Sequence, residues 1–206
     1  MKKILFVVTV IVCLFLTACA TKEESLMEKI QERLTSMESY RCTADLIRIT
    51  NKGENTYGIA QFYKSSGEYK LMITSPDNLK GNYTVYNGEK ICQFSASAGG
   101  KVIADAPESQ ARNELFLGSF VKNYMQSEEV SVDVAVMDES RCTVLEAVIP
   151  GNNRYTATEK LWIDNETLDP VRLAIYDTEG KERYIIDYKD FEFNCTFAEG
   201  TFDITN

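Results

Sequence analysis

The sequence predicts a mainly β fold with some helix (α+β), in which an N-terminal helix and one inserted helix accompany a curved antiparallel sheet of about ten strands. Short runs rich in Tyr, Thr, Ile and Val recur about every ten residues, and these residue types suit a pleated surface. The connections are short, which indicates antiparallel neighbours, because parallel strands need long crossovers. A twisted sheet of this size tends to curl, so we expect a partial barrel with the two helices covering its opening.

The first helix is expected over residues 21–39. Its apolar residues recur at three- and four-residue steps, which gives one apolar stripe: Met27, Ile30, Leu34 and Met37. Ser25 and Glu28 have the spacing of a capping box, in which each side chain accepts a backbone N–H of the other residue. We therefore place the helix start close to Cys19.

Strand patterns follow the helix. The first group of expected strands covers residues 40–50, 56–64, 68–74, 80–86 and 90–96. Asn87-Gly88 lies between the last two, and this pair favours the positive φ angles of a type I′ hairpin turn.

Ser97-Ala98-Gly99-Gly100 interrupts the strand pattern. Asp105-Ala106-Pro107-Glu108 then reads as a helix start, and a helical stripe continues to about Met125. The second group of expected strands covers residues 130–137, 142–149, 155–164, 171–176 and 183–193.

Residues 1–18 have the features of a bacterial lipoprotein signal peptide. Lys2 and Lys3 precede an uncharged apolar run over residues 4–16. At about 1.5 Å per residue this run reaches about 20 Å, which is too short for a hydrocarbon core of about 30 Å. Leu16-Thr17-Ala18-Cys19 resembles a lipobox, which implies cleavage before Cys19, a lipid on its thiol and a location on the extracytoplasmic face of the cell membrane.

Residues 19–206 are expected to form a single domain. Removing Lys2 and Lys3 from the 22 basic residues leaves 20 against 31 acidic ones, a formal charge of −11. Such a surface is a poor partner for nucleic acid, which needs clustered Lys and Arg. By charge we expect a basic partner or none, and a homodimer stays open.

Four cysteines remain after the signal peptide and Cys19 are set aside: Cys42, Cys92, Cys142 and Cys195. They allow two disulfides in three connectivities. All four lie in strand-like runs and none has CxxC spacing, which favours four separate buried thiols.

Groups for catalysis are scarce. The sequence has no histidine, which removes Ser-His-Asp and Cys-His catalysis and the usual catalytic zinc sites. The adjacent acidic pairs read as solvated helix ends and turns: Glu23/Glu24, Glu128/Glu129 and Asp138/Glu139. Asp187 and Asp190 have odd spacing in a strand and should lie on opposite faces. We expect no catalytic residue, no metal site and no cofactor.

The C-terminal third carries a recognisable pattern. Residues 161–172, 176–181 and 188–191, with a late Phe202, resemble the LolA/LolB-like lipoprotein-sorting superfamily. The residues that carry the resemblance are fold markers: Trp162, Asp164, Thr167, Pro170 and Gly180. The resemblance implies a curved antiparallel half-barrel whose mouth is closed by helices, and we expect Trp162 to be largely buried.

A narrower resemblance is to the clostridial germination lipoproteins of the GerS type. It rests on residues 39–42, Lys52-Gly53 with Tyr57, Ser75-Pro76 with Lys80-Gly81, and residues 86–88 and 149–152. That family is implied to act in the spore envelope, where it binds and activates a cortex peptidoglycan amidase of the CwlD type, which holds the zinc. No catalytic residue carries over, and the partner-binding residues stay unknown.

Three functions follow. The first is a lipid-anchored, non-catalytic amidase activator, and the second is a carrier or sensor that holds lipid or lipoprotein in the half-barrel. An enzyme is the third, and the missing histidine disfavours it. A carrier needs an unfilled apolar cavity, whereas an interaction protein can fill its interior and expose a sheet edge or a loop.

Overall fold

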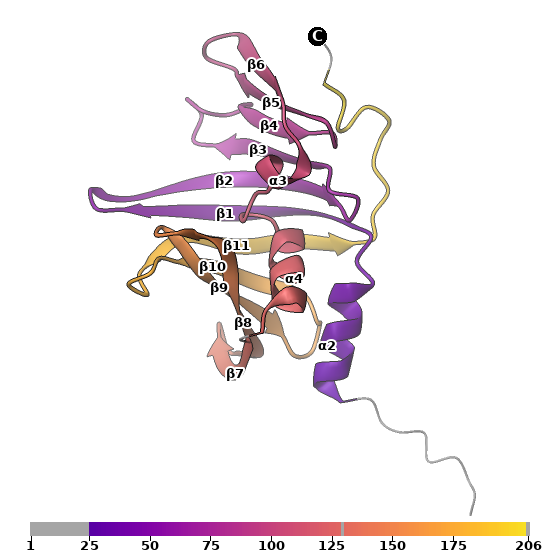
Figure 1. The fold of residues 1–206 in the computed structure, drawn as a ribbon, viewed down its shortest axis with the longest axis vertical. Helices are drawn as coiled ribbons and strands as arrows, with labels where there is room; N and C mark the ends of the chain where they lie inside the picture. Colours follow the sequence, from indigo (N-terminus) through magenta and orange to yellow (C-terminus); the bar gives the residue numbers. More distant parts are fainter. Residues whose placement is uncertain (1–24, 129, 205–206) are drawn as a thin grey trace, which may run out of the picture.

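The computed structural model describes residues 25–128 and 130–204. Eleven strands form one open antiparallel sheet in the order β6-β5-β4-β3-β2-β1-β11-β10-β9-β8-β7 (Figure 1). Their bounds are β1 Ser39–Thr50, β2 Gly53–Lys64, β3 Tyr69–Ser75, β4 Tyr83–Tyr86, β5 Lys90–Ser95, β6 Gly100–Asp105, β7 Val130–Met137, β8 Ser140–Asn153, β9 Thr156–Asp164, β10 Pro170–Tyr176 and β11 Glu182–Phe193.

Two meanders meet in the middle of the sheet. Strands β1 to β6 follow one another on one side and β7 to β11 on the other, and β1 pairs with β11, Arg41 opposite Glu192. The chain passes between the meanders through helices α3 (Glu108–Ala111) and α4 (Leu117–Gln126). Strands β6 and β7 are therefore the two edges.

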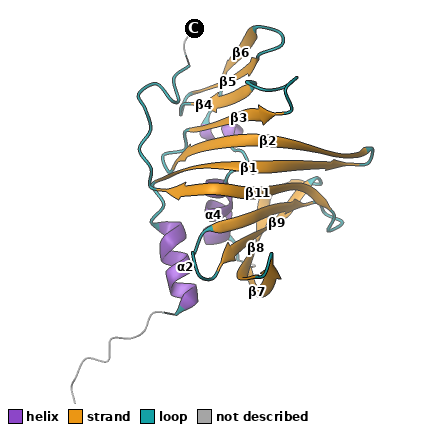
Figure 2. Cartoon of the chain, turned by 180° about the vertical axis from the view of Figure 1, so that it is seen from behind, coloured by secondary structure: helices purple, strands orange, loops and turns teal. Residues whose placement is uncertain are grey.

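Helix α4 covers one face of the sheet, which we name the inner face (Figure 2). Alternate residues of β1 point to it (Tyr40, Cys42, Ala44 and Leu46) and belong to one buried cluster with residues of both helices α2 (Leu26–Thr35) and α4. A smaller cluster joins β4 and β5 to the C-terminal segment through Val85, Cys92 and Phe202. The helices thus cover the centre of the inner face.

The first helix is confirmed, although it is shorter than expected. Helix α2 covers Leu26–Thr35, and residues 21–24 lie outside the described part. Ser25 Oγ accepts the Glu28 N–H at 3.2 Å, and Glu28 Oε2 accepts the Ser25 N–H at 2.8 Å. This is the capping box that the spacing predicts.

Ten of the eleven strands match expected ones, and β6 is the exception. The sequence around Gly99-Gly100 reads as a break, but in the structure Gly99 has a φ of 61° and turns the chain from β5 into β6. Strand β6 is an edge with mostly exposed side chains, so it lacks the alternation of apolar and polar residues that marks a half-buried strand.

The second helix is divided, whereas the sequence predicts one continuous helix over residues 105–125. Arg112 is extended, with φ −53° and ψ 134°, and ends α3. The Asn113 side chain then accepts the Leu115 N–H at 3.1 Å, which supports a turn before α4. A local side-chain bond to the backbone competes with the helix here.

The β4–β5 hairpin is confirmed, but the expected turn type is wrong. Gly88 has a φ of 96°, while Asn87 is not among the residues with positive φ. Asn87 Oδ1 instead accepts the N–H groups of Glu89 and Lys90 at 3.1 and 2.9 Å. This Asx contact stabilises a wider turn.

Candidate interaction surfaces

The expected fold-marker residues shape turns and do not form a site. Asp164 Oδ1 accepts the backbone N–H groups of Glu166 and Thr167 at 2.8 and 2.9 Å, and the bond from Thr167 is the main reason that the Asp164 pKa is lowered. Pro170 is buried at the start of β10, while Gly180 has a φ of 73° in the turn before β11. These residues fix the β9–β10 and β10–β11 hairpins.

Trp162 is partly buried, and it lies on the face of the sheet that α4 does not cover. Its neighbours in β9, Leu161 and Ile163, point to the inner face and are 0% and 1% exposed. Strand alternation places Trp162 on the opposite face, opposite Val144 of β8 and Arg172 of β10. The helices cover only the inner face.

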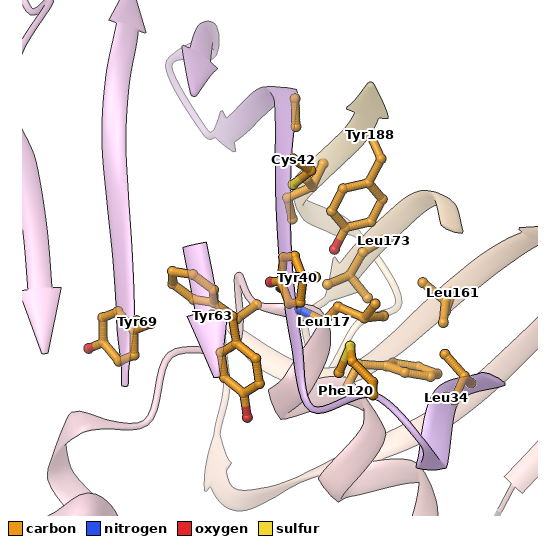
Figure 3. Close-up of a cluster of buried hydrophobic side chains, with 14 of the residues drawn as sticks. Leu34, Tyr40, Cys42, Tyr63, Tyr69, Leu117, Phe120, Leu161, Leu173 and Tyr188 are labelled. Atoms are coloured by element: carbon orange, nitrogen blue, oxygen red, sulfur yellow. Dashed lines mark hydrogen bonds between the residues drawn. The ribbon is translucent and has the colours of Figure 1, made fainter. Parts of the chain in front are cut away.

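The inner face is filled by aromatic and aliphatic side chains (Figure 3). Tyr40, Phe116, Leu117 and Phe120 are all 0% exposed. Gly118 of α4 lies so close to the Tyr63 ring that an added Cβ would overlap it. Helix α4 therefore packs directly on the centre of the sheet.

Polar contacts fix this packing. Tyr40 Oη accepts the Leu117 N–H at 3.1 Å and donates to Gln61 Oε1 at 2.9 Å. The Gln61 carboxamide donates to the Leu115 carbonyl at 2.8 Å. These bonds satisfy buried groups of β1 and β2 and hold the start of α4 in one position.

One buried carboxyl group faces α4 from the sheet. Glu159 of β9 is 0% exposed, and burial raises its pKa to about 8. Asn123 of α4 donates to Glu159 Oε1 and also to Glu114 at 3.2 Å. Within the described residues, Glu159 Oε2 and the Tyr188 hydroxyl are buried without a hydrogen-bond partner. The group is enclosed, so it bears on stability and not on a substrate.

All four expected cysteines are buried, and each is a free thiol. Cys42 contacts Gln61 in the interior, and burial raises the pKa of its thiol. Cys92 belongs to the smaller cluster with Val85 and Phe202. This arrangement agrees with four separate thiols that pack as small apolar side chains.

Within residues 25–128 and 130–204, no group of three or more Cys, Asp or Glu side chains is placed to hold a metal ion. In the same part of the chain, no helix is long and apolar enough to cross a membrane. Asp187 and Asp190 have separate partners, Arg172 and Thr43, and do not form one site. The expectation that they lie on opposite faces is wrong, because the strand bulges at Asp190, where φ is 44°, and Asp190 reaches Thr43 on the same face as Asp187.

Strand β7 is an open apolar edge, which we name the valine edge. Its valines are exposed by 46%, 51%, 64% and 71%: Val130, Val132, Val134 and Val136. Val130 and Val132 lie opposite Ala147 and Leu145 of β8, whose side chains point to the inner face, so these valines belong to the same face. Among the strands of residues 25–128 and 130–204, none pairs with the outer side of the β7 backbone. An unpaired edge with exposed valines can accept another chain.

The sequence contains the signal for this surface. Valines alternate with other residues through Val130–Met137, a pattern that normally marks a buried face. Only the position of β7 at the end of the sheet order shows that the valines stay uncovered.

The chain belongs to a known protein family. Residues 1–202 match the family of YdcC-like sporulation proteins. The chain is 20% identical over 203 residues to the sporulation protein YdcC of Bacillus subtilis (strain 168), and the match covers 97% of this chain and 59% of that protein. The chain thus spans about 59% of the length of this relative.

Two solved structures are also similar. One is the GerS lipoprotein in a structure of its complex with the CwlD amidase from Clostridioides difficile. The match has 33% identity and a TM-score of 0.50 over 85% of this chain and 97% of that one. An uncharacterized conserved protein from Thermus thermophilus matches with a TM-score of 0.56 at 13% identity, over 88% and 95% of the two chains, and shows the fold alone. The resemblance to GerS-type proteins is confirmed, and so is the open antiparallel sheet that the fold markers of the C-terminal third imply.

Proposed function

Because the chain belongs to the family of YdcC-like sporulation proteins, we propose that it is a non-catalytic envelope protein that binds and activates a cell-wall amidase. The solved structure that it matches at 33% identity holds the GerS lipoprotein in complex with the CwlD amidase. A peptidoglycan amidase needed for spore germination is therefore the proposed partner.

The filled centre of the inner face is the observation that carries this proposal. A carrier needs an empty apolar space, but Tyr40, Phe116 and Phe120 occupy the centre and are 0% exposed. The valine edge offers the opposite feature, an apolar surface with an unpaired backbone. Such an edge supports a protein partner that adds a strand or covers the valines.

The chain brings little chemistry of its own, since its sequence has no histidine. We therefore assign the hydrolysis to the amidase. An activator must bind the active state of the enzyme more tightly than the inactive state. In this proposal the amidase gains activity, or zinc affinity, when the protein binds.

Lipidation of Cys19 is part of the proposal, and Cys19 lies outside the described residues. Attachment to the extracytoplasmic face of a membrane would raise the local concentration of a partner that works there. Cys19→Ala should move the protein from the detergent phase to the aqueous phase in a phase-partition assay. Continued partitioning into detergent would refute the anchor.

The test of activation uses the mature chain with Cys19→Ala and the purified amidase. We expect no peptidoglycan hydrolysis by the protein alone, a complex of the two on size exclusion, and faster hydrolysis by the amidase in that complex. Hydrolysis by the protein alone, or the absence of a complex, would end this proposal.

A lipid carrier is the second candidate because one part of the inner face is uncovered. An open groove of about 520 Å³ lies over β3 to β6, and Leu71, Ile73 and Val102 line it. Extraction and mass analysis of lipid from the purified protein tests this candidate. Stoichiometric lipid without an amidase complex would favour the carrier.

A further inference from the structure

A cleft lies at the end of the sheet formed by the β1–β2 hairpin, and we name it the hairpin cleft. Its volume is about 550 Å³. Three parts of the chain line it, namely the hairpin, the β8–β9 connection and the start of β11: Arg48, Ile49, Thr50, Asn51, Lys52, Asn153, Tyr155, Thr156, Arg183 and Tyr184. The cleft thus depends on the meeting of both meanders.

The lining is cationic. It contains Arg48, Lys52 and Arg183 and no carboxylate. Arg183 pairs with the buried Asp177, with 2.5 Å between Nη2 and Oδ2. Among the ion pairs of residues 25–128 and 130–204, none involves Arg48 or Lys52. Two uncompensated cations therefore share a hollow on a chain whose formal charge is −9.

A further guanidinium group lies beside the cleft. The Tyr155 side chain is 50% exposed, and its ring centroid is 4.7 Å from the Arg154 guanidinium carbon and 5.7 Å from that of Arg183. Stacking on the ring orients both guanidinium groups next to the hollow. A planar guanidinium can donate two parallel hydrogen bonds to one carboxylate, so the cleft is suited to carboxylates.

The uncharged lining residues narrow the class of ligand. Asn51 and Asn153 provide amides, and Thr50 and Thr156 provide hydroxyls. These groups both donate and accept, as the hydroxyl and acetamido groups of a sugar require. A hollow of this size suits one or two sugar units, whereas a protein segment is more often bound by a flatter surface with apolar anchors. The cleft therefore favours a glycan that carries carboxylates.

The hairpin cleft is far from the start of the domain. Strand β1 runs from Ser39, next to α2, to Thr50 at the hairpin, and the hairpin tip and α2 lie at opposite ends of the sheet (Figure 1). Twelve residues in a strand span about 40 Å. A molecule anchored through Cys19 can therefore present the cleft away from the membrane.

Resting on the proposed function, we propose that the hairpin cleft binds the carboxylate-bearing glycan that the partner amidase produces. Hydrolysis of the amide between glycan and peptide adds the hydroxyl of water to the carbonyl carbon and a proton to the peptide nitrogen. Each cut leaves one carboxylate on the glycan and one amine on the released peptide. The cleft recognises the new carboxylate and keeps the processed strand near the enzyme.

The binding test uses the mature chain with Cys19→Ala and short peptidoglycan glycan strands from which an amidase has removed the peptides. The matched probes are the same strands with their carboxylates converted to neutral amides, and hexaglutamate as an acidic peptide. We expect saturable binding of the carboxylate strands, binding at least about tenfold weaker to the neutral strands, and weaker binding at high salt. Equal binding of the neutral strands, tighter binding of hexaglutamate, or no binding of any strand would overturn the proposal.

The variant Arg48→Ala/Lys52→Ala should weaken glycan binding at least about tenfold. Lys29→Ala/Lys80→Ala removes the same charge from positions outside the cleft lining and should leave binding unchanged. Circular dichroism and thermal melting check that both variants fold. If both variants lose binding equally, the attraction is general and the cleft is not the site.

Amidase binding is measured in parallel, so that the two proposals fail separately. An intact amidase complex without glycan binding refutes the cleft proposal alone. Glycan binding that depends on Arg48 and Lys52, without an amidase complex, refutes the proposed function and leaves a glycan-binding cleft. Loss of the amidase complex in the cleft variant, without glycan binding by the parent, makes the cleft an enzyme contact and overturns the glycan proposal.

Discussion

Glu159→Gln should make the protein more stable at neutral and alkaline pH. The parent side chain is buried against α4, and burial raises its pKa to about 8 from an ordinary value of 4.5. Its surroundings include Asn123 and Glu114 from the α4 side, Arg112 near the end of α3, and Tyr188 from β11. Glutamine keeps the size of the side chain and its contact with Asn123 without a charge.

The direction of this change in stability with pH follows from proton linkage. Because the folded protein holds the proton up to a higher pH than the unfolded chain, the stabilisation is complete below about pH 4.5 and is lost as pH rises through about 8. Each pH unit in this interval lowers the free energy of unfolding by about 1.4 kcal/mol, which gives a ceiling of about 5 kcal/mol. Movement of α4 that admits water reduces the effect, so we expect about 2–5 kcal/mol.

The assay is urea unfolding at intervals from pH 4.5 to 8.5, with the mature chain carrying Cys19→Ala as the parent. The difference in unfolding free energy between Glu159→Gln and the parent should grow with pH across this range. Glu166→Gln, at an exposed position in the β9–β10 turn, is the matched control and should follow the parent. A difference that stays constant with pH would show that Glu159 is not enclosed as the structure describes.

Three further predictions concern packing, the valine edge and the thiols. Gly118→Ala should lower the free energy of unfolding, measured in urea, by about 1–3 kcal/mol, because the added Cβ overlaps the Tyr63 ring. Gly100→Ala is the control and should lower it less, because its Cβ would meet only the Ala98 carbonyl oxygen at 3.9 Å. Val132→Glu/Val134→Glu should weaken the amidase complex at least about tenfold in titration calorimetry without changing the melting temperature. Val102→Glu on the opposite edge is the control and should leave the affinity unchanged. An unchanged affinity of the Val132/Val134 variant would exclude the valine edge as the interface. The four buried cysteines should react with a thiol reagent only after unfolding, and no reaction in the unfolded, unreduced protein would show disulfides instead.

Local signals in the sequence predict much of this fold. Ser25 and Glu28 identify the start of α2, because a capping box involves only neighbouring residues. Short turns also involve only neighbouring residues, and they mark the ends of ten of the eleven strands. Strand β6 escapes prediction because an edge strand does not need an apolar face, and Gly99-Gly100 suggests a longer interruption than the turn that is present.

The candidate surfaces depend on contacts between distant parts of the chain, which local patterns do not report. Whether α4 covers the Trp162 side chain depends on the face of the sheet on which this helix packs, and local patterns do not specify that face. The valine edge depends on β7 being last in the sheet order. Arg48 and Arg183 belong to one cleft only because β1 pairs with β11, Arg48 opposite Tyr184.

The pairing of β1 with β11 also has a consequence for how the protein is made. The first strand finds one of its two partners about 150 residues later in the chain, as Arg41 and Glu192 show. Contacts of such long separation form slowly, because a large loop must close before they stabilise the product. Until residues 182–193 have left the ribosome, β1 therefore lacks β11, and the centre of the sheet is incomplete. A premature stop before Glu182 should leave β1 and β10 without their shared partner strand, as two unpaired edges. We expect proteases to degrade such a chain.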